Sequence, residues 1–197
     1  MQTLKRKTVY YKSDTLEKAV EHLKKLIVNY FNLKHRHNVI VHCIFDIDDT
    51  LIFDVPEEPK GIENNLIIRL FHFAKSYGIR VHLVTARLDS KGVKKWTETQ
   101  LKAHNIQCYD SLSLAPLVER KDLATVSSWK HSVREKLHSQ SNNIVLFSVG
   151  DQWGDGKQLQ SEQDILTQNK KFKVAKKSFQ IHEGQGCVYF LKLTDDL

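Results

Sequence analysis

Three acids and a hydroxyl follow directly on an apolar run in the first third of the chain. Residues 39–51 read VIVHCIFDIDDTL and place Asp46, Asp48, Asp49 and Thr50 at the end of a run rich in Val and Ile. Such a run is typical of a strand buried on both faces of a parallel sheet. Ligands of open α/β sheets bind beyond the carboxyl ends of the strands. We therefore expect these acids to be functional, although Asp and Thr are also common capping residues.

Two later apolar runs also end in polar residues. IRVHLV at 79–84 is followed by Thr85, and IVLFSV at 144–149 is followed by Asp151 and Asp155. Right-handed β-α-β connections make consecutive strands parallel, so that their carboxyl ends share one edge of the sheet. The pattern predicts that residues about a hundred positions apart in sequence meet in one site.

Carboxylates gathered at one edge would repel each other unless a cation lay among them. The polar residues that end these runs include no His or Cys, and ligation by oxygen alone indicates Mg²⁺, which binds through a few carboxylates, water and a substrate phosphate. The hydroxyl and N–H of Thr85 suit a phosphate oxygen. Lys130, which we expect in the first turn of a helix beginning near 127, adds a positive contact to the same group. Together, these residues predict a site that reacts with a phosphoryl group.

The motifs resemble those of the haloacid dehalogenase-type (HAD) phosphohydrolases. DIDDT at 46–50, LVTAR at 83–87, Lys130 at a helix start and GDQWGD at 150–155 are similar to the four motifs of that family, in the same order. The wording of VGDQWGD and of WKHSVR, at 129–134, is similar to the plant and class B-type acid phosphatase branch. The resemblance implies a phosphatase.

Roles for the acids follow from this resemblance. It implies that Asp46 is the nucleophile, which forms an aspartyl-phosphate, and that Asp48 is first the general acid and then the base. Covalent catalysis of this kind splits one difficult displacement into two easier ones. The implied Mg²⁺ ligands are Asp46, the backbone carbonyl of Asp48, Asp151 and, directly or through water, Asp155.

The resemblance also implies how the phosphoryl group is held and what the fold is. Thr85 and Lys130 would grip the phosphoryl group. The implied fold is a three-layer α/β/α Rossmann-like HAD fold with a mainly parallel sheet. We expect one domain over 1–197, with a helical extension at 1–38 and a catalytic core at 39–197, because the length suits a single α/β core.

The stretches between the motifs are short. Those from Asp46 to Thr85 and from Thr85 to Lys130 are too short for a folded cap domain, so we expect a site that is open to solvent and to bulky substrates. The formal net charge of +7 favours polyanions among them. We expect a large or polyanionic phosphorylated substrate, with nucleic acid narrowly ahead of phosphoprotein. One alternative is a phosphatase specific for nucleotides or polynucleotide ends, and another is a catalytically silent HAD-fold binding protein.

The remaining expectations concern individual residues. For Asp49 we favour a solvated or capping role over catalysis. For Trp153 we favour packing under its loop over stacking on a leaving group. For Arg87 and Arg134 two roles are equally compatible with the sequence: each could contact a substrate anion or be a charge on a helix surface. The glycines at 150–156 fit neither a dinucleotide-binding motif nor a P-loop.

Composition restricts the environment of the protein. No apolar run approaches the length of a membrane span, and the polar start MQTLKRKTVYYK lacks the apolar stretch of a signal peptide. Three widely spaced cysteines fit a reduced compartment rather than a disulfide framework. We therefore expect a cytoplasmic protein that does not bind membranes. Acid phosphatases of the similar branch are commonly exported, so the resemblance fixes neither substrate nor compartment.

Periodicity and turn residues predict the elements that position these groups. Helices are expected at 14–31, 62–77, about 93–104 and from near 127, and a cap at Gly78. Strands are expected at 39–45, 79–84, 106–109, 144–149 and 188–193. Loops are expected at 34–38, at 52–61 and over much of 110–126, and a helix or loop at 157–170.

Overall fold

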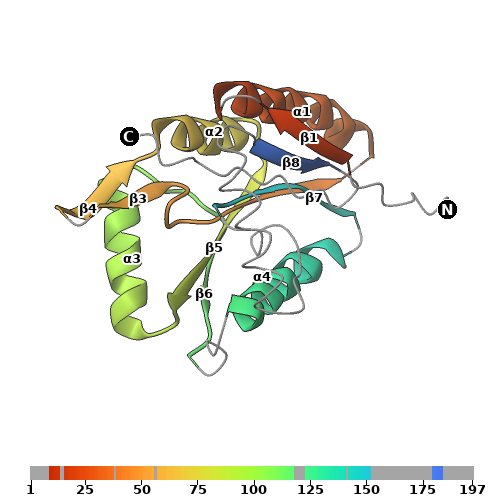
Figure 1. Cartoon of the computed structure of the whole chain (residues 1–197). Helices are drawn as coiled ribbons and strands as arrows, with labels where there is room; N and C mark the ends of the chain where they lie inside the picture. The colour runs from red at the N-terminus through yellow and green to blue at the C-terminus, as the bar shows by residue number, and fades with distance from the viewer. Residues whose placement is uncertain are drawn as a thin grey trace.

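A four-stranded parallel sheet forms the centre of the molecule. The computed structural model describes residues 9–13, 16–37, 39–55, 57–117, 123–140, 142–151 and 179–183. The strand order is β6-β5-β2-β7, and each neighbouring pair is parallel. The four strands are β2 (Ile40–Phe45), β5 (Arg80–Leu88), β6 (Ser111–Ala115) and β7 (Asn143–Val149). The predicted parallel sheet is confirmed (Figure 1).

The helices of the described residues connect and cover these strands (Figure 1). They are α1 (Leu16–His37), α2 (Asn65–Ser76), α3 (Lys91–Ala103) and α4 (Leu123–His138). From β2 through α2 to β5, and through α3 to β6, the chain steps across the sheet in one direction. From β6 through α4 to β7 it returns in the other. Because β-α-β crossovers are right-handed, this reversal places α4 on the face opposite α2 and α3.

Among the described residues, two clusters of buried side chains agree with this layering. The larger cluster joins α1, α2 and Leu101 of α3 to side chains of β2, β5 and β7. The smaller one joins Ile44, Val84 and Val145 to three residues of α4, namely Trp129, Val133 and Leu137. The three-layer α/β/α arrangement is therefore confirmed. The direction in which the chain crosses the sheet reverses between β2 and β7.

That reversal decides where a ligand can enter. In open α/β sheets the crevice lies outside the carboxyl ends of the two strands at the switch point. Phe45 pairs with Val149 in the register of β2 and β7, and the Asp46 N–H donates to the Val149 carbonyl at 2.8 Å. Asp46 thus lies at the mouth of this crevice.

A β-hairpin follows the first acids, where a loop was predicted at 52–61. It is formed by β3 (Ile52–Val55) and β4 (Glu58–Glu63). Gly61 has φ +73°, and a Cβ there would collide with Ile52 Cγ2 and with the Phe53 carbonyl, so this register requires glycine. Pro59 is compatible because a two-stranded hairpin leaves outward-facing N–H positions that need no partner. Pro59 and Gly61, which indicated a loop, belong instead to a hairpin.

Several predicted boundaries were wrong. The expected loop at 34–38 is mostly the last turn of α1, because its Lys, His and Arg residues allow a helix to continue and no Pro or Gly stops it. Ile106–Tyr109 is not a strand: Asn105 and Cys108 have positive φ angles of 56° and 61°, so the chain turns there. The strand is β6, at Ser111–Ala115.

Two further corrections move site residues within their elements. β5 continues to Leu88, so Thr85 lies inside the strand, next to an irregularity in the pairing with β6, rather than after the strand. α4 begins at Leu123, so Lys130 lies in the middle of the helix rather than in its first turn. The helix at Asn65–Ser76 and the positive φ of Gly78 agree with the prediction.

A second small sheet pairs β1 (Val9–Ser13) with β8 (Phe179–Glu183) in antiparallel fashion. The expected helix or loop at 157–170 and the expected strand at 188–193 lie outside the described residues. Among the helices that are described, none combines the length and the apolar character needed to cross a membrane.

Candidate active site

The first predicted acid forms a buried ion pair. Asp46 follows the last residue of β2 and is 5 % exposed. Lys130 Nζ donates to Asp46 Oδ1 at 2.7 Å, and the Lys130 side chain is 7 % exposed. Removing two charges from water costs several kcal/mol per ion, so a buried pair is weak grounds for stability and invites a functional explanation. The sheet and α4 bring these residues together although they are 84 positions apart in sequence.

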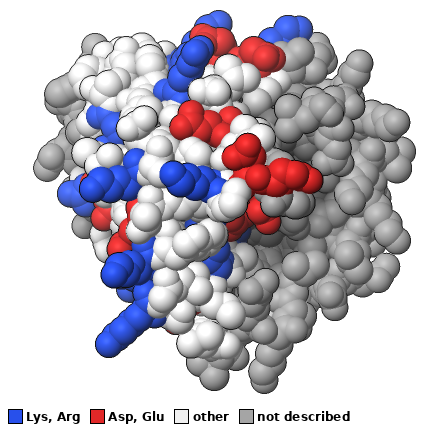
Figure 2. Space-filling view, turned by 90° about the vertical axis from the view of Figure 1, so that its left-hand side faces the viewer, with Lys and Arg blue, Asp and Glu red and all other residues white. Residues whose placement is uncertain are grey.

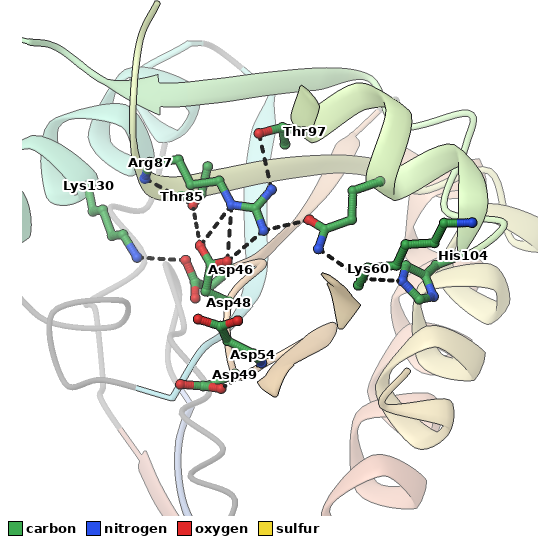
Figure 3. A network of polar contacts seen from close by, with 11 residues as sticks. Asp46, Asp48, Asp49, Asp54, Lys60, Thr85, Arg87, Thr97, His104 and Lys130 are labelled. Atoms are coloured by element: carbon green, nitrogen blue, oxygen red, sulfur yellow. Dashed lines mark hydrogen bonds and ion pairs between the residues drawn. The ribbon is translucent and has the colours of Figure 1, made fainter. Parts of the chain in front are cut away.

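The second predicted acid meets strand β5. Asp48 Oδ2 accepts a hydrogen bond from Thr85 Oγ1 at 3.1 Å. Arg87 makes a bidentate contact with the same carboxylate: Nη2 donates to Oδ1 at 2.6 Å, and Nε lies 3.0 Å from Oδ1 and 3.1 Å from Oδ2. Figure 3 shows Asp46 and Asp48 side by side, with Lys130 reaching one and Thr85 and Arg87 reaching the other. Five residues from three parts of the chain thus converge.

Helix α3 fixes the guanidinium of Arg87. Nη1 donates to Thr97 Oγ1 at 3.1 Å and Nη2 to Gln100 Oε1 at 2.7 Å, while the guanidinium carbon lies 4.4 Å from the ring centroid of Trp96. The Arg87 side chain is only 9 % exposed, whereas that of Asp48 is 43 % exposed. One of the two roles predicted for Arg87, a charge on a helix surface, is wrong, because Arg87 lies in β5 and its side chain is largely buried.

Sequence analysis missed Thr97 and Gln100. Both are buried polar residues on the same face of α3 as Leu101. A polar side chain that falls on the apolar face of an amphipathic helix needs a buried partner. That pattern was visible in the sequence and points to a polar group beneath the helix.

The contacts of α3 continue to the β3–β4 hairpin. Gln100 Nε2 donates to the Lys60 carbonyl at 2.9 Å, and His104 Nε2 lies 2.7 Å from the same oxygen. His104 Nδ1 lies 3.1 Å from Glu63 Oε1. The hairpin, α3 and Asp48 are therefore joined by one polar network (Figure 3).

A tight turn at residues 47–52 connects the candidate acids to the β3–β4 hairpin. The Ile47 carbonyl accepts from the N–H groups of Thr50, Leu51 and Ile52. Asp49 has φ +53° and its carboxylate accepts the Asp54 N–H at 3.3 Å. The exposed side chain of Asp49 thus supports the turn, which agrees with the role expected of it.

The remaining candidates lie at or beyond the end of β7 and on α4. Asp151 is two residues beyond the end of β7, the strand that pairs with β2. Arg134 is buried on α4, one turn after Lys130. Asp155 and Trp153 lie outside the described residues.

The acids at this edge of the sheet offer the kind of donor atom that Mg²⁺ prefers. Within the described parts of the chain, no three side chains of His, Cys, Asp or Glu gather closely enough to hold a metal ion. Mg²⁺, however, is usually bound by one or two carboxylates, with water and a substrate phosphate completing the octahedron. Asp46 and Asp151 follow the paired strands β2 and β7 and offer oxygen ligands only. This set fits Mg²⁺.

A second buried polar cluster lies toward the opposite end of β2 and β5. His42 Nδ1 and His82 Nε2 are 2.8 Å apart, and His82 Nδ1 is 2.7 Å from Ser111 Oγ. Burial, followed by the charge that His42 would carry, lowers the pKa of His82 to about 4. Burial also lowers the pKa of His42. Both imidazoles are therefore neutral near pH 7, with one proton between the two facing nitrogens.

The layered sheet and the acids at its switch point define a HAD-like protein, and the comparison of sequences names the branch. Residues 57–183 match the family described as HAD superfamily, subfamily IIIB (Acid phosphatase). The match covers more than half of the chain, so the chain belongs to this family of phosphohydrolases. Asp46 and Asp48 precede the matched range, which includes Thr85, Lys130 and Asp151. No curated protein sequence matches the chain significantly.

Solved structures share the fold at low sequence identity. One is the "Structure of Pnkp1/Rnl/Hen1 complex", with TM-score 0.52 and 16 % identity over 80 % of this chain and 47 % of the other. Another is the "Structure of the Pnkp1/Rnl/Hen1 RNA repair complex", with TM-score 0.53 and 17 % identity over 81 % and 44 %. This chain thus spans less than half the length of either. The class C acid phosphatase from Bacillus anthracis has TM-score 0.49 and 13 % identity over 91 % and 84 %.

Proposed function

We propose that the protein is a Mg²⁺-dependent phosphomonoesterase that works through an aspartyl-phosphate on Asp46. The observation that carries this proposal is the pairing of a buried carboxylate with Lys130 beside a second, more exposed carboxylate, Asp48. A nucleophile needs a fixed orientation, and an acid or base needs access to the leaving group and to water. The two acids have these different environments.

In the first step a carboxylate oxygen of Asp46 attacks phosphorus. The bond from phosphorus to the ester oxygen breaks, and Asp48 in its acid form gives its proton to that oxygen. Lys130 and Thr85 stabilise the phosphoryl oxygens by hydrogen bonds and, in the case of Lys130, by charge. The products are the alcohol and phosphate bound covalently to Asp46.

In the second step Asp48, now ionised, takes a proton from water. The resulting hydroxide attacks phosphorus, the bond to the Asp46 oxygen breaks, and inorganic phosphate leaves. Arg87 holds the Asp48 carboxylate beside the reacting group in both steps, whereas the Thr85 hydroxyl, which donates to Asp48 in the free protein, turns to the phosphoryl oxygens when substrate binds. We assign Arg87 this positioning role.

Mg²⁺ would be held by Asp46, the Asp48 carbonyl and Asp151, with Asp155 as a further ligand. When bound, it would offset negative charge on the phosphoryl oxygens and relieve repulsion between the acids. Everything else in the mechanism is done by side chains of this chain.

The proposed substrate is large or polyanionic. Between Asp46 and Lys130 the described residues add only the β3–β4 hairpin to the core elements, which supports an open site in a single domain whose core includes α1. The net charge of +7 favours polyanions. Phosphatase action on nucleotides or polynucleotide ends is the specific alternative, and the RNA repair complexes that share the fold are compatible with it.

Asp46→Asn tests the proposal. We expect phosphate release from an aryl phosphate to require Mg²⁺ and to fall at least about a thousandfold in the variant, because the nucleophile is lost while the side-chain volume is kept. Circular dichroism should show the parent fold. Asp49→Asn is the matched control, since Asn tolerates the same positive φ, and its activity should remain within a few fold of the parent. Activity of Asp46→Asn within tenfold of the parent would refute covalent catalysis by Asp46.

A further inference from the structure

Trp96 presents an aromatic ring beside the candidate active site. It is 50 % exposed, although large apolar side chains are usually covered. The Arg87 guanidinium lies over its ring at 4.4 Å. One face of the indole is therefore covered by Arg87, while half of the Trp96 surface stays open to solvent. A ring held in this way is a rigid stacking surface, because little side-chain entropy remains to be lost on binding.

The ring is separated from the reacting groups by one side chain. Arg87 contacts Trp96 on one side and, through Nη2 at 2.6 Å, Asp48 on the other. A group attached to the leaving oxygen that Asp48 protonates must pass close to Arg87. The exposed face of Trp96 is then within reach of the part of the substrate next to the scissile phosphate.

A row of lysines adjoins this ring on α3. Lys91, Lys95 and Lys102 are exposed and recur at helical spacing along one side of the helix. Trp96 and Gly92 lie on the neighbouring row, and a Cβ added at Gly92 would meet nothing within 4 Å, so the surface beside Trp96 is open. The single acid of this helix is Glu98.

The neighbouring hairpin carries the opposite charge. Asp54, Glu57 and Glu58 are exposed on or beside β3 and β4. Figure 2 faces the side of the molecule on which α3 and the hairpin lie, and basic side chains occupy one part of this face while acidic side chains occupy another. A polyanion leaving the site is repelled by the hairpin and attracted along α3, so charge selects its path.

We infer that this face of α3 binds the nucleotides next to the terminal phosphate of a single-stranded nucleic acid. The inference rests on the proposed function, because it places the terminal phosphate at Asp46. A stacking ring followed by a row of cations is the combination that binds single strands, since every base has a π-face and every linkage a charge. A phosphopeptide lacks both the regular rings and the regular charges.

The test compares kcat/KM for an aryl phosphate with that for single-stranded oligonucleotides of about eight nucleotides, phosphorylated at the 5′ or the 3′ end. We expect the parent to prefer one of the oligonucleotides. Trp96→Ala should lower the ratio of oligonucleotide to aryl phosphate kcat/KM about tenfold, the scale of one lost base stack, and Trp96→Phe should restore most of it. Lys91→Ala/Lys95→Ala should lower the same ratio and make it less sensitive to salt. Lys18→Ala/Lys25→Ala, on the distant helix α1, is the charge-matched control and should leave the ratio unchanged.

Three outcomes would overturn the inference. They are an aryl phosphate preferred over both oligonucleotides, equal losses on both substrate types in Trp96→Ala, and a phosphopeptide whose kcat/KM falls as far as that of the oligonucleotide in the same variants. If the parent protein did not hydrolyse any of these phosphate esters, the proposed function would be refuted instead. In that case fluorescence anisotropy of a labelled oligonucleotide still decides, because binding must weaken in Trp96→Ala and in Lys91→Ala/Lys95→Ala but not in the α1 control.

Discussion

Strands β2 and β5 carry a polar pair toward each end, and the two pairs are built differently. Beyond their carboxyl ends, Asp46 and Asp48 are charged and meet Lys130 and Arg87. Closer to their amino ends, His42 and His82 are uncharged and meet each other. Both pairs cross between neighbouring elements, and both require groups to leave bulk water.

Under the proposed mechanism, the difference separates side chains that take part in the reaction from side chains that only pack. A neutral imidazole can be buried if it finds a hydrogen-bond partner. A buried charge loses several kcal/mol of hydration free energy, which interactions with other charges or hydrogen bonds must offset. Proteins retain such charges at an accessible edge where substrate, cation and water take part. The histidine pair lies inside the sheet and is nearly inaccessible, so its chemistry is limited to packing and to its response to acid.

The largest effect that separates the two pairs is expected for Lys130→Met. Methionine keeps the apolar stem and removes the charge that faces Asp46. We expect kcat to fall at least about a hundredfold, the scale of a lost contact to a developing negative charge. Lys136→Met, at an exposed position in the last turn of α4, is the control. Near-normal turnover in Lys130→Met would confine Lys130 to packing and transfer its role to another cation.

A smaller effect is expected for Arg87→Lys, which keeps the charge and removes the bidentate contact with Asp48. If Arg87 positions Asp48, kcat for an aryl phosphate should fall about tenfold with little change in KM, and the pH profile should shift, because lysine is a point charge without a planar fork. Arg69→Lys, on the exposed face of α2, is the control. An effect on KM alone would show that Arg87 contacts the substrate instead.

The smallest effect concerns stability at the histidine pair. The unfolded chain gains a proton on His82 near pH 6.5, whereas the folded protein does so only at about pH 4. Between these values the unfolded state binds more protons, so the free energy of unfolding should decrease as pH falls from 6.5 to 4, by on the order of 2 kcal/mol.

Urea denaturation at several pH values measures this decrease. His82→Gln should flatten the pH dependence in this window, whatever its own stability at neutral pH. An unchanged slope in His82→Gln would show that other groups, not this pair, carry the response to acid.

Sequence reasoning succeeded where one signal dominated. The apolar runs before Asp46 and after Asn143 are unambiguous strands, and a shared edge follows from the handedness of β-α-β crossovers. It failed where two elements have similar composition. Pro56, Pro59 and Gly61 indicate a loop and a tight hairpin equally well, and only the pairing of β3 with β4 distinguishes them.

The partners of the site residues were harder to predict than the residues themselves. Asp48 was a candidate from its spacing, but its contact with Arg87 depends on β5 continuing beyond Thr85 to Leu88. The support of Arg87 by α3 depends on which face of the helix is buried. Long-range side-chain contacts of this kind arise from packing, which local sequence patterns do not encode.

The most direct test of covalent catalysis is to trap the phosphorylated residue. Asp48→Asn with 4-nitrophenyl phosphate and Mg²⁺ should form the intermediate, because this leaving group departs without a proton, and should hydrolyse it slowly, because the base is missing. Acid quenching and peptide mass spectrometry should then find the phosphoryl group on Asp46. A phosphoryl group on another residue, or a parent enzyme that turns over while no phosphorylated residue appears in the variant, would contradict the proposed mechanism.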